Sequence, residues 1–373
     1  MHYKDALEPL NQPISLQQKL VHCHRIVQRQ LPFVARIAVT IYDPATTVLK
    51  TYVHSSGEDD PLSNYQTRLD EAPSLKAILE RGEPRIINNL LTFEGSGKEH
   101  TRRIGRQGYA ASYTLPMFYN GGFFGFIFFN SRETDVFTER ALSELDVFAH
   151  LISLMVIDEL SSIRALTAAL STAAHITHQR DPETGSHLDR MSRYSQLIAR
   201  KIAASQNLSD EFVEHVFMFA PLHDIGKVAI PDRILLKPGP LDEEERRVMA
   251  THTRKGLEIV DHMIARFNLN AIQHVEVLRN IVRYHHEPVS GEQAPELEGR
   301  EVPLEARIVA VADVFDALTS ARPYKDAWDI DLAFDELRRL AGPRLDPGCV
   351  QALVESREEV EDIMTRFDES RLG

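Results

Sequence analysis

The run His-Asp-Ile-Gly-Lys at residues 223–227 decides how the C-terminal half of this chain is interpreted. His223 and Asp224 are adjacent, so together they offer a divalent metal one neutral nitrogen and one anionic oxygen, and the carboxylate can bridge to a second ion. Further potential ligands lie on both sides of the pair: Glu183, His187, His252, His285, His286 and Asp313. Eight nitrogen and oxygen ligands are too many for one ion, so the sequence predicts a cluster of two or three divalent metal ions.

The local sequence around several of these residues supports a shared site over the alternative of scattered helical histidines. Glu183 and His187 are four residues apart, so on one helix they share a face. His285 and His286 are adjacent and project about 100° apart on a helix, so both reach a cluster only if it lies between their directions. Asp313 lies in an apolar helical stretch, where a lone buried carboxylate is costly and a metal is the expected partner.

Distinctive motifs surround these ligands from about Arg180 to Lys325. In order, they are Arg-Asp-Pro-Glu-Thr-Gly-Ser-His at 180–187, His-Asp-Ile-Gly-Lys-Val-Ala-Ile-Pro-Asp at 223–232, Lys-Pro-Gly-Pro-Leu at 237–241, His-His-Glu at 285–287, Ala-Arg-Ile-Val-Ala-Val-Ala-Asp-Val-Phe-Asp-Ala-Leu-Thr-Ser at 306–320 and Arg-Pro-Tyr-Lys at 322–325. This constellation resembles the HD-GYP family, metal-dependent phosphodiesterases of the HD superfamily that cleave cyclic di-GMP. One signature differs. Where the family usually carries Asp-Gly-Thr-Gly-Tyr-Pro, residues 290–295 read Ser-Gly-Glu-Gln-Ala-Pro.

The resemblance implies that the protein hydrolyses cyclic di-GMP, with Asp224 and Lys227 as catalytic residues. The product is pGpG, and further cleavage to GMP stays open. It also implies that Lys227, Arg322 and Lys325 contact the substrate phosphates. Asp316 is expected to hold a ligand histidine or a helix end. Two alternatives stay open: a phosphodiesterase for another cyclic or linear dinucleotide, and a degenerate receptor that binds cyclic di-GMP without cleaving it.

The expected metals are iron or manganese. Mixed histidine and carboxylate ligation without thiolates disfavours a structural zinc site and suits these two metals. In the family that the chain resembles, a glutamate at the position of Glu183 accompanies a three-metal site, whereas members without it tend to hold two.

The predicted fold class is α+β, with an N-terminal α/β sensor domain at 1–137, a long connecting helix at 138–176 and an all-α HD-type domain at 177–373. The first part alternates helix-like and strand-like runs, which are helices at 14–31 and 73–81 and strands at 35–42, 48–53, 85–87, 112–118 and 123–129. Asn120-Gly121 predicts a hairpin, because these residues tolerate the positive φ of a type I′ turn. This layout resembles a GAF domain, with a PAS domain as the alternative.

The connecting helix carries an apolar seam with alternating steps of four and three residues: Leu145, Ala149, Ile152, Val156, Ile163, Leu166, Leu170 and Ala173. Such a heptad seam predicts a parallel coiled-coil homodimer. The alternative is a single amphipathic helix that packs along its own domains.

Composition sets the remaining expectations. The net charge of −13 disfavours nonspecific binding to nucleic acid or anionic membranes. No apolar run approaches the ~20 residues of a membrane-spanning helix, and no secretory signal is evident. Cys23 and Cys349 lie far apart and suggest no disulfide framework, so the expected location is the reducing cytoplasm.

Overall fold

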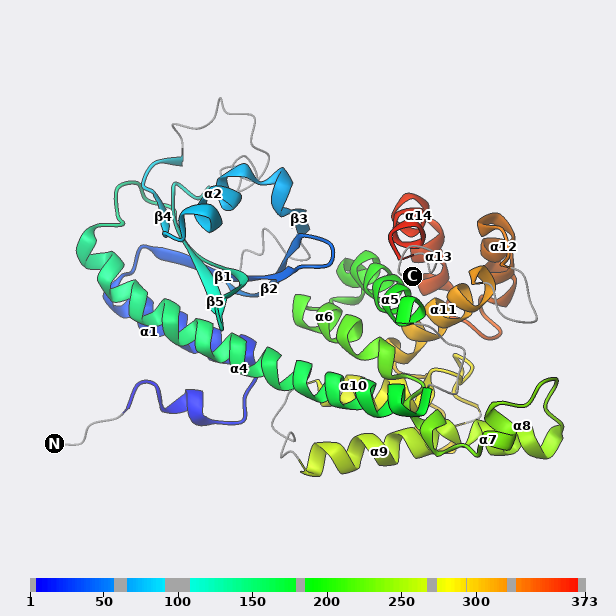
Figure 1. Ribbon diagram of the computed structural model, residues 1–373. Coiled ribbons are helices and arrows are strands. Elements are labelled where there is room, and N and C mark those ends of the chain that lie inside the picture. The colour runs from blue at the N-terminus through cyan, green and yellow to red at the C-terminus, as the bar shows by residue number, and fades with distance from the viewer. Residues whose placement is uncertain are drawn as a thin grey trace. The chain divides into compact units, whose positions relative to one another are not determined.

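The computed structural model describes residues 5–56, 66–90, 108–178, 185–266, 274–292, 294–320 and 327–367. The chain divides into two compact units, Met1–Ser161 and Ser162–Gly373. The boundary falls inside the long helix α4 (Glu139–His178). The first unit contains the sheet and the second consists mainly of helices (Figure 1). The predicted α+β fold class, with a helical C-terminal part, is therefore confirmed.

The first unit is built on one antiparallel sheet with strand order β3-β2-β1-β6-β5-β4. Its strands are β1 (Val34–Asp43), β2 (Val48–Ser55), β3 (Gln66–Arg68), β4 (Arg85–Ile87), β5 (Ala111–Tyr119) and β6 (Gly122–Ser131). The predicted hairpin joins β5 to β6, and both of its turn residues have positive φ, +48° at Asn120 and +79° at Gly121. Short 3-10 turns η1 (Glu8–Asn11) and η2 (Leu69–Glu71) precede α1 and α2.

Helices cover both faces of this sheet. On one face, α2 (Pro73–Arg81) buries Leu75 and Ile78 against Phe126 and Phe128. On the other face lie α1 (Leu16–Gln30) and the first half of α4, where the Tyr52 hydroxyl donates to Glu159 at 3.2 Å (Figure 1). Local signals define the helix ends. A capping box at Ser15 begins α1, and Gly82, with φ +67°, ends α2.

The second unit is a helical domain. It contains α5 (Gly185–Gln206), α6 (Asp210–Phe219), η4 (Ala220–Leu222), η5 (Ile225–Ala229), α7 (Asp232–Leu235), α8 (Glu243–Ala250), α9 (His252–Arg266), α10 (Val275–Tyr284), η7 (Pro295–Leu297), α11 (Leu304–Thr319), α12 (Ile330–Leu340), α13 (Pro347–Val354) and α14 (Arg357–Arg366). Its core lies where α5, α10 and α11 meet, and Tyr194, Ile281 and Phe315 are fully buried there. The metal ligands predicted above belong to this unit.

The apolar seam predicted for dimerisation is buried within the chain. Leu145, Ile152 and Val156 are each 0% exposed, and Ile163 and Leu166 belong to the core of the helical unit. The side chains of Leu170 and Ala173 lie outside the described residues. This is the packing expected of the alternative, a helix that packs along its own domains, so a dimer through this seam would require the seam to be uncovered.

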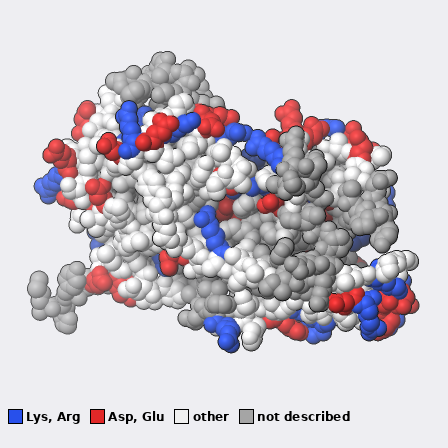
Figure 2. Space-filling view, in the orientation of Figure 1, with Lys and Arg blue, Asp and Glu red and all other residues white. Residues whose placement is uncertain are grey.

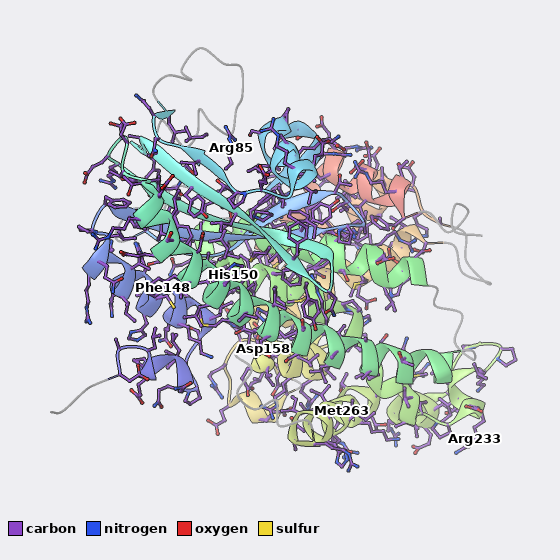
Figure 3. The ribbon with its side chains drawn as sticks, turned by 60° about the vertical axis from the view of Figure 1, so that its left-hand side comes forward. Arg85, Phe148, His150, Asp158, Arg233 and Met263 are labelled. Carbon is purple, nitrogen blue, oxygen red and sulfur yellow. The ribbon has the colours of Figure 1, made fainter. Side chains whose placement is uncertain are left out.

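The opposite side of α4 faces solvent and carries apolar groups. Val147 is 67% exposed and Leu154 is 66% exposed, two turns further along the helix. His150 and Asp158, which are labelled on α4 in Figure 3, are also exposed. The exposed side of α4 therefore combines two large apolar side chains with polar ones.

Charged groups of both signs are mixed on the face of the molecule shown in Figure 2. Over α8, for example, Arg247 pairs with Glu243 and Glu244 at 2.9 and 3.1 Å. Among the described helices, none is long and apolar enough to cross a membrane.

Candidate metal centre

Seven of the eight predicted ligands come together in two neighbouring groups. One group contains Asp224, His252, His285 and His286, and the other contains His187, His223 and Asp313. Within each group, one potential ligand atom from every residue lies within 4.8 Å of the others. Glu183 lies outside the described residues. The two groups adjoin, because the His223 and His285 rings are 5.0 Å apart.

The ligands come from helix ends and short turns as well as from one helix interior. His223 and Asp224 lie between η4 and η5, two 3-10 turns that follow α6. His252 begins α9, and His285 follows the last residue of α10, so His285 and His286 lie just past a helix end. His187 lies in the first turn of α5, and Asp313 lies within α11.

Gly226 explains why the His-Asp-Ile-Gly-Lys turn can approach α9 so closely. A Cβ at this position would lie 1.8 Å from the His252 carbonyl oxygen and 2.5 Å from the Gly256 nitrogen. Only glycine fits against these backbone atoms. The close contact places Asp224 beside His252, with Asp224 Oδ1 at 3.1 Å from His252 Nε2.

Three of the histidines are oriented by backbone carbonyls. Their Nδ1 atoms contact carbonyl oxygens three or four residues earlier: His223 to Ala220 at 2.9 Å, His252 to Met249 at 2.8 Å and His285 to Ile281 at 3.0 Å. A carbonyl only accepts, so each Nδ1 carries the proton and each Nε2 of the neutral ring presents a lone pair. Burial lowers the pKa of His285, which favours this neutral form.

Asp224 stands between the two groups. Its Oδ1 lies 3.1 Å from His252 Nε2 and 3.6 Å from His285 Nε2, whereas its Oδ2 lies 3.2 Å from His223 Nε2 and 2.8 Å from Lys227 Nζ. Burial alone would raise the pKa of Asp224, but the positive charge of the neighbouring Lys227 holds it well below the ordinary value. The carboxylate is therefore ionised and is placed to bridge the two groups.

This arrangement fits divalent cations. The Nε2 atoms of His252 and His285 and Oδ1 of Asp224 are buried and have no hydrogen-bond partner among the described residues. Lone pairs of neutral imidazoles that face a carboxylate oxygen cannot satisfy one another, whereas a cation between them satisfies both. The donor set is nitrogen and oxygen only, since Cys23 and Cys349 belong to neither group. The ligands can therefore hold divalent metal ions.

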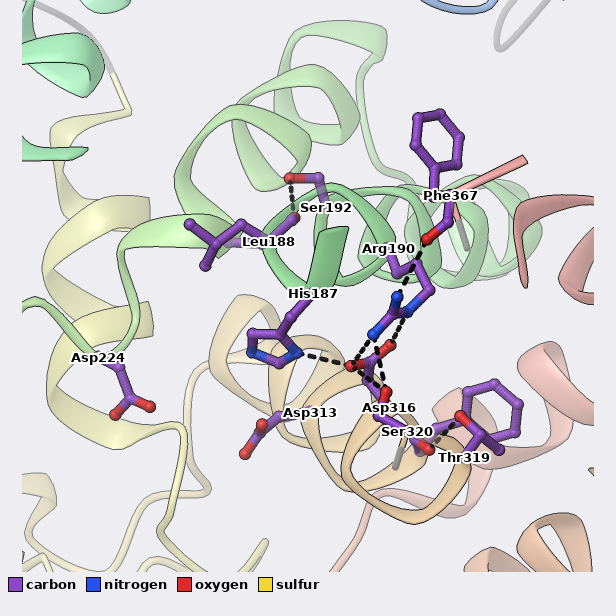
Figure 4. A network of polar contacts seen from close by, with 12 residues as sticks. His187, Leu188, Arg190, Ser192, Asp224, Asp313, Asp316, Thr319, Ser320 and Phe367 are labelled. Carbon is purple, nitrogen blue, oxygen red and sulfur yellow. Dashed lines mark hydrogen bonds and ion pairs between the residues drawn. The ribbon is translucent and has the colours of Figure 1, made fainter. Parts of the chain in front are cut away.

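His187 is held differently, by a carboxylate. Its Nδ1 lies 2.6 Å from Oδ2 of Asp316, which confirms the expectation that Asp316 holds a ligand histidine (Figure 4). Asp316 also accepts from Arg190 Nε at 2.6 Å. Sequence reasoning missed Arg190. Its spacing three residues after His187, on the same helix face, was the available signal.

The predicted substrate-binding residues Arg322 and Lys325 lie outside the described residues, as does Gln293. Ala294, at the position of the family's tyrosine, is 1% exposed. Ala294 packs in a small cluster with Leu297, Val302 and Ala306. A tyrosine at this position would have to displace this cluster.

Comparison with known proteins decides the family of this unit. Residues 182–349 match the family model described as HD domain. This part of the chain is an HD domain. The ligand residues His187, His223, Asp224, His252, His285, His286 and Asp313 all lie within the matched range.

Curated proteins similar to the HD domain are named as phosphodiesterases of cyclic dinucleotides. Cyclic di-GMP phosphodiesterase response regulator RpfG of Xanthomonas campestris is 46% identical over 199 residues, which are 53% of this chain and 50% of the relative. A cyclic di-GMP phosphodiesterase of Thermotoga maritima is 39% identical over 51% of this chain and 49% of its own length. These relatives support the predicted resemblance to the HD-GYP family. 3'3'-cGAMP-specific phosphodiesterase 2 of Vibrio cholerae is 33% identical over 63% of this chain and 46% of its own length. The chain spans about half the length of the curated relatives it matches.

Solved structures similar to the chain include GAF domains. One is a phycocyanobilin-bound GAF domain from a cyanobacterial phytochrome, with 14% identity, coverage of 41% of this chain and 90% of that chain, and a TM-score of 0.33. Another is the GAF domain of an Acinetobacter phosphoenolpyruvate-protein phosphotransferase, with 16% identity, coverage of 42% and 91%, and a TM-score of 0.34.

Proposed function

We propose that the HD domain is a metal-dependent phosphodiesterase that hydrolyses cyclic di-GMP to pGpG, with GMP as a further product. The observation that carries this proposal is the ionised Asp224 carboxylate between two groups of imidazole nitrogens, at 3.1 Å from His252 and 3.2 Å from His223. The names of the relatives from Xanthomonas and Thermotoga support the same substrate.

Asp224 and Lys227 have different roles in the proposed in-line displacement at phosphorus. Two or three divalent ions, when bound, would polarise the phosphate and make an attacking water acidic. The oxygen of water bonds to phosphorus, the bond from phosphorus to the 3′-oxygen breaks, and the proton ends on that 3′-oxygen. Asp224 holds the two halves of the centre together. Lys227, 2.8 Å from Asp224, adds positive charge for a phosphate oxygen.

We assign iron or manganese to the centre, because histidine and carboxylate ligands without thiolates suit these metals. Glu183 would complete a third metal position. Arg322 and Lys325, which follow α11, are proposed to bind the substrate phosphates, since a guanidinium can hold phosphate oxygens bidentately.

A second substrate class has specific support. Three relatives are named 3'3'-cGAMP-specific phosphodiesterases, at 27–33% identity. The buried Ala294 in place of the family's tyrosine also makes the loop beside the histidines unlike that of the HD-GYP pattern. A different cyclic dinucleotide, a linear dinucleotide, or binding without turnover are the alternatives to cyclic di-GMP hydrolysis.

The remaining proposals concern the whole protein. The N-terminal unit would act as a GAF-like sensor (1–137) that regulates the HD domain through the connecting helix (138–176). The chain would form a homodimer along α4, by its exposed side, where Val147 and Leu154 meet solvent. Both cysteines are buried free thiols, which suits the reducing cytoplasm.

Product analysis with a ligand variant tests the proposed function. The full chain, prepared without oxygen, is incubated separately with cyclic di-GMP and 3'3'-cGAMP, and the products are separated by ion-exchange chromatography. We expect pGpG from cyclic di-GMP and a loss of at least about 100-fold in Asp224→Asn, because even residues that only support a metal ligand cost 10–100-fold.

Asp261→Asn is the matched control, since Asp261 pairs with Arg279 on the surface of the same domain. It should keep wild-type turnover. Cleavage of 3'3'-cGAMP alone would shift the substrate to the second class. A metallated protein that binds cyclic di-GMP and releases no linear product would contradict the enzyme and favour a receptor.

A further inference from the structure

His187 differs from the three histidines that backbone carbonyls orient. Those three take their Nδ1 partner from three or four residues earlier in the chain, so their orientation is set locally. The Nδ1 partner of His187 is Asp316, 129 residues away on α11. The direction of His187 Nε2 therefore depends on how α11 is held against α5.

Asp316 is held by a fork from Arg190. Arg190 Nε donates to Oδ1 at 2.6 Å and Nη2 donates to Oδ2 at 3.0 Å (Figure 4). Asp316 is 0% exposed and Arg190 is 6% exposed. A buried carboxylate without a cation is costly, so Arg190 is what keeps Asp316 charged at this place.

The same guanidinium reaches two further groups. Its Nη2 donates to the Ser320 hydroxyl at 2.7 Å, and its Nη1 donates to the Phe367 carbonyl at 3.0 Å. Ser320 in turn lies 3.0 Å from Asp316 Oδ2. Arg190 on α5 therefore contacts both Ser320, the residue after α11, and Phe367, the residue after α14.

We propose that Arg190 and Asp316 are positioning residues that aim His187 Nε2 at the metal of the group His187, His223 and Asp313. This inference rests on the proposed metal centre and deepens it. The two residues set the metal affinity of that group. In the other group, the rings of His252 and His285 are oriented by backbone carbonyls, so its metal affinity should not depend on Arg190 and Asp316.

The electrostatics agree with this geometry. Asp316 Oδ2 lies 2.6 Å from His187 Nδ1, and both carboxylate oxygens accept from Arg190. An anionic acceptor at Nδ1 makes the imidazole a stronger donor to a metal through Nε2. Loss of Arg190 would remove the guanidinium that holds the buried Asp316 carboxylate, and the carboxylate would no longer fix the His187 ring in this way.

Metal titration of the full chain tests the proposal. Metal-free wild type, Asp316→Asn, Arg190→Gln and Arg190→Lys are titrated with Mn²⁺ under anaerobic conditions, and bound metal is counted against a competing chelator. We expect Asp316→Asn and Arg190→Gln to weaken one metal position about 10–100-fold and to leave the others unchanged. Arg190→Lys keeps the buried charge but loses the fork, so its effect should be smaller.

Arg307→Gln is the matched control. Arg307 lies on α11, as Asp316 does, and forms an Arg–Asp pair with Asp346 at 2.5 Å. It should lower the unfolding temperature without changing the metal titration. Circular dichroism of each variant identifies any that fail to fold, and Arg190→Lys provides a milder change in that case.

The outcomes distinguish a failure of the positioning role from a failure of the metal centre. Wild type that binds two or more ions, with variants that lose none, lose all equally, or behave as Arg307→Gln does, would overturn the positioning role and leave the metal centre standing. Wild type that binds no metal would overturn the metal centre and the positioning role together.

Discussion

At the scale of single residues, Gly226 is the position with the least room for change. It lies two residues after Asp224 in sequence, and its α-carbon faces the start of α9. The atoms that a side chain would meet, the His252 carbonyl and the Gly256 nitrogen, both belong to backbone and cannot rotate away. Any side chain must push η5 off α9.

We therefore expect Gly226→Ala to damage stability and metal binding together. Overpacking in a filled interior costs about 1–3 kcal/mol, and the displacement would separate Asp224 from His252. Thermal unfolding and elemental analysis measure the two effects. Gly348→Ala serves as the control, because its Cβ would meet only a side-chain oxygen of Asp346 at 3.2 Å. A Gly226→Ala protein with wild-type metal content would show that the close contact does not position Asp224.

The candidate ligand residues could be proposed from sequence, because nearly every one lies in a distinctive local motif. Seven of the eight are described, and they form two adjoining groups as the set requires. The partners of the Nδ1 atoms were not accessible. Carbonyls of Ala220, Met249 and Ile281 carry no side-chain signal, and Arg190 meets Asp316 only through the packing of α5 on α11.

At the scale of elements, α4 shows what a heptad pattern can and cannot predict. The pattern identifies an amphipathic helix, and α4 spans Glu139–His178. It does not identify what the apolar side contacts, because the same spacing suits a partner helix and the chain's own domains. The described seam residues are buried inside the chain, so the proposed dimer must use the exposed side.

If the chain dimerises by the exposed side of α4, a charge introduced there should weaken the dimer. Leu154→Glu places a carboxylate at a site that is 66% exposed in the single chain, so folding should be unaffected while a dimer contact would be destabilised. We expect light scattering to give the mass of a dimer for wild type and of a monomer for the variant. Leu332→Glu, at a leucine that is 60% exposed on α12, should stay dimeric. A monomeric wild type at all concentrations would contradict the dimer.

The strands were predictable for a local reason. The expected strands at 35–42 and 123–129 lie inside β1 (Val34–Asp43) and β6 (Gly122–Ser131), because β-branched and aromatic runs are bounded by clear turn residues. The loop at 290–295 was less accessible. Its departure from the family pattern was visible in the sequence, but the burial of Ala294 beside Leu297 depends on tertiary packing.

At the scale of the whole molecule, the net charge of −13 opposes the approach of an anionic dinucleotide. Divalent ions in the HD domain would make the electrostatic potential positive at the site where the phosphates bind, because ions are the largest local charges in such a site. Lys227 adds one positive charge beside Asp224. The proposed hydrolysis of an anionic dinucleotide therefore depends on metal being present in the domain.

Metal content tests this dependence on metal most directly. We predict that elemental analysis of the full chain, purified without oxygen, gives two to three iron or manganese ions per chain, as the ligand set requires. Glu183→Ala should lower this number by about one and leave the ions at Asp224 in place. Fewer than one metal ion per folded wild-type chain would contradict the account.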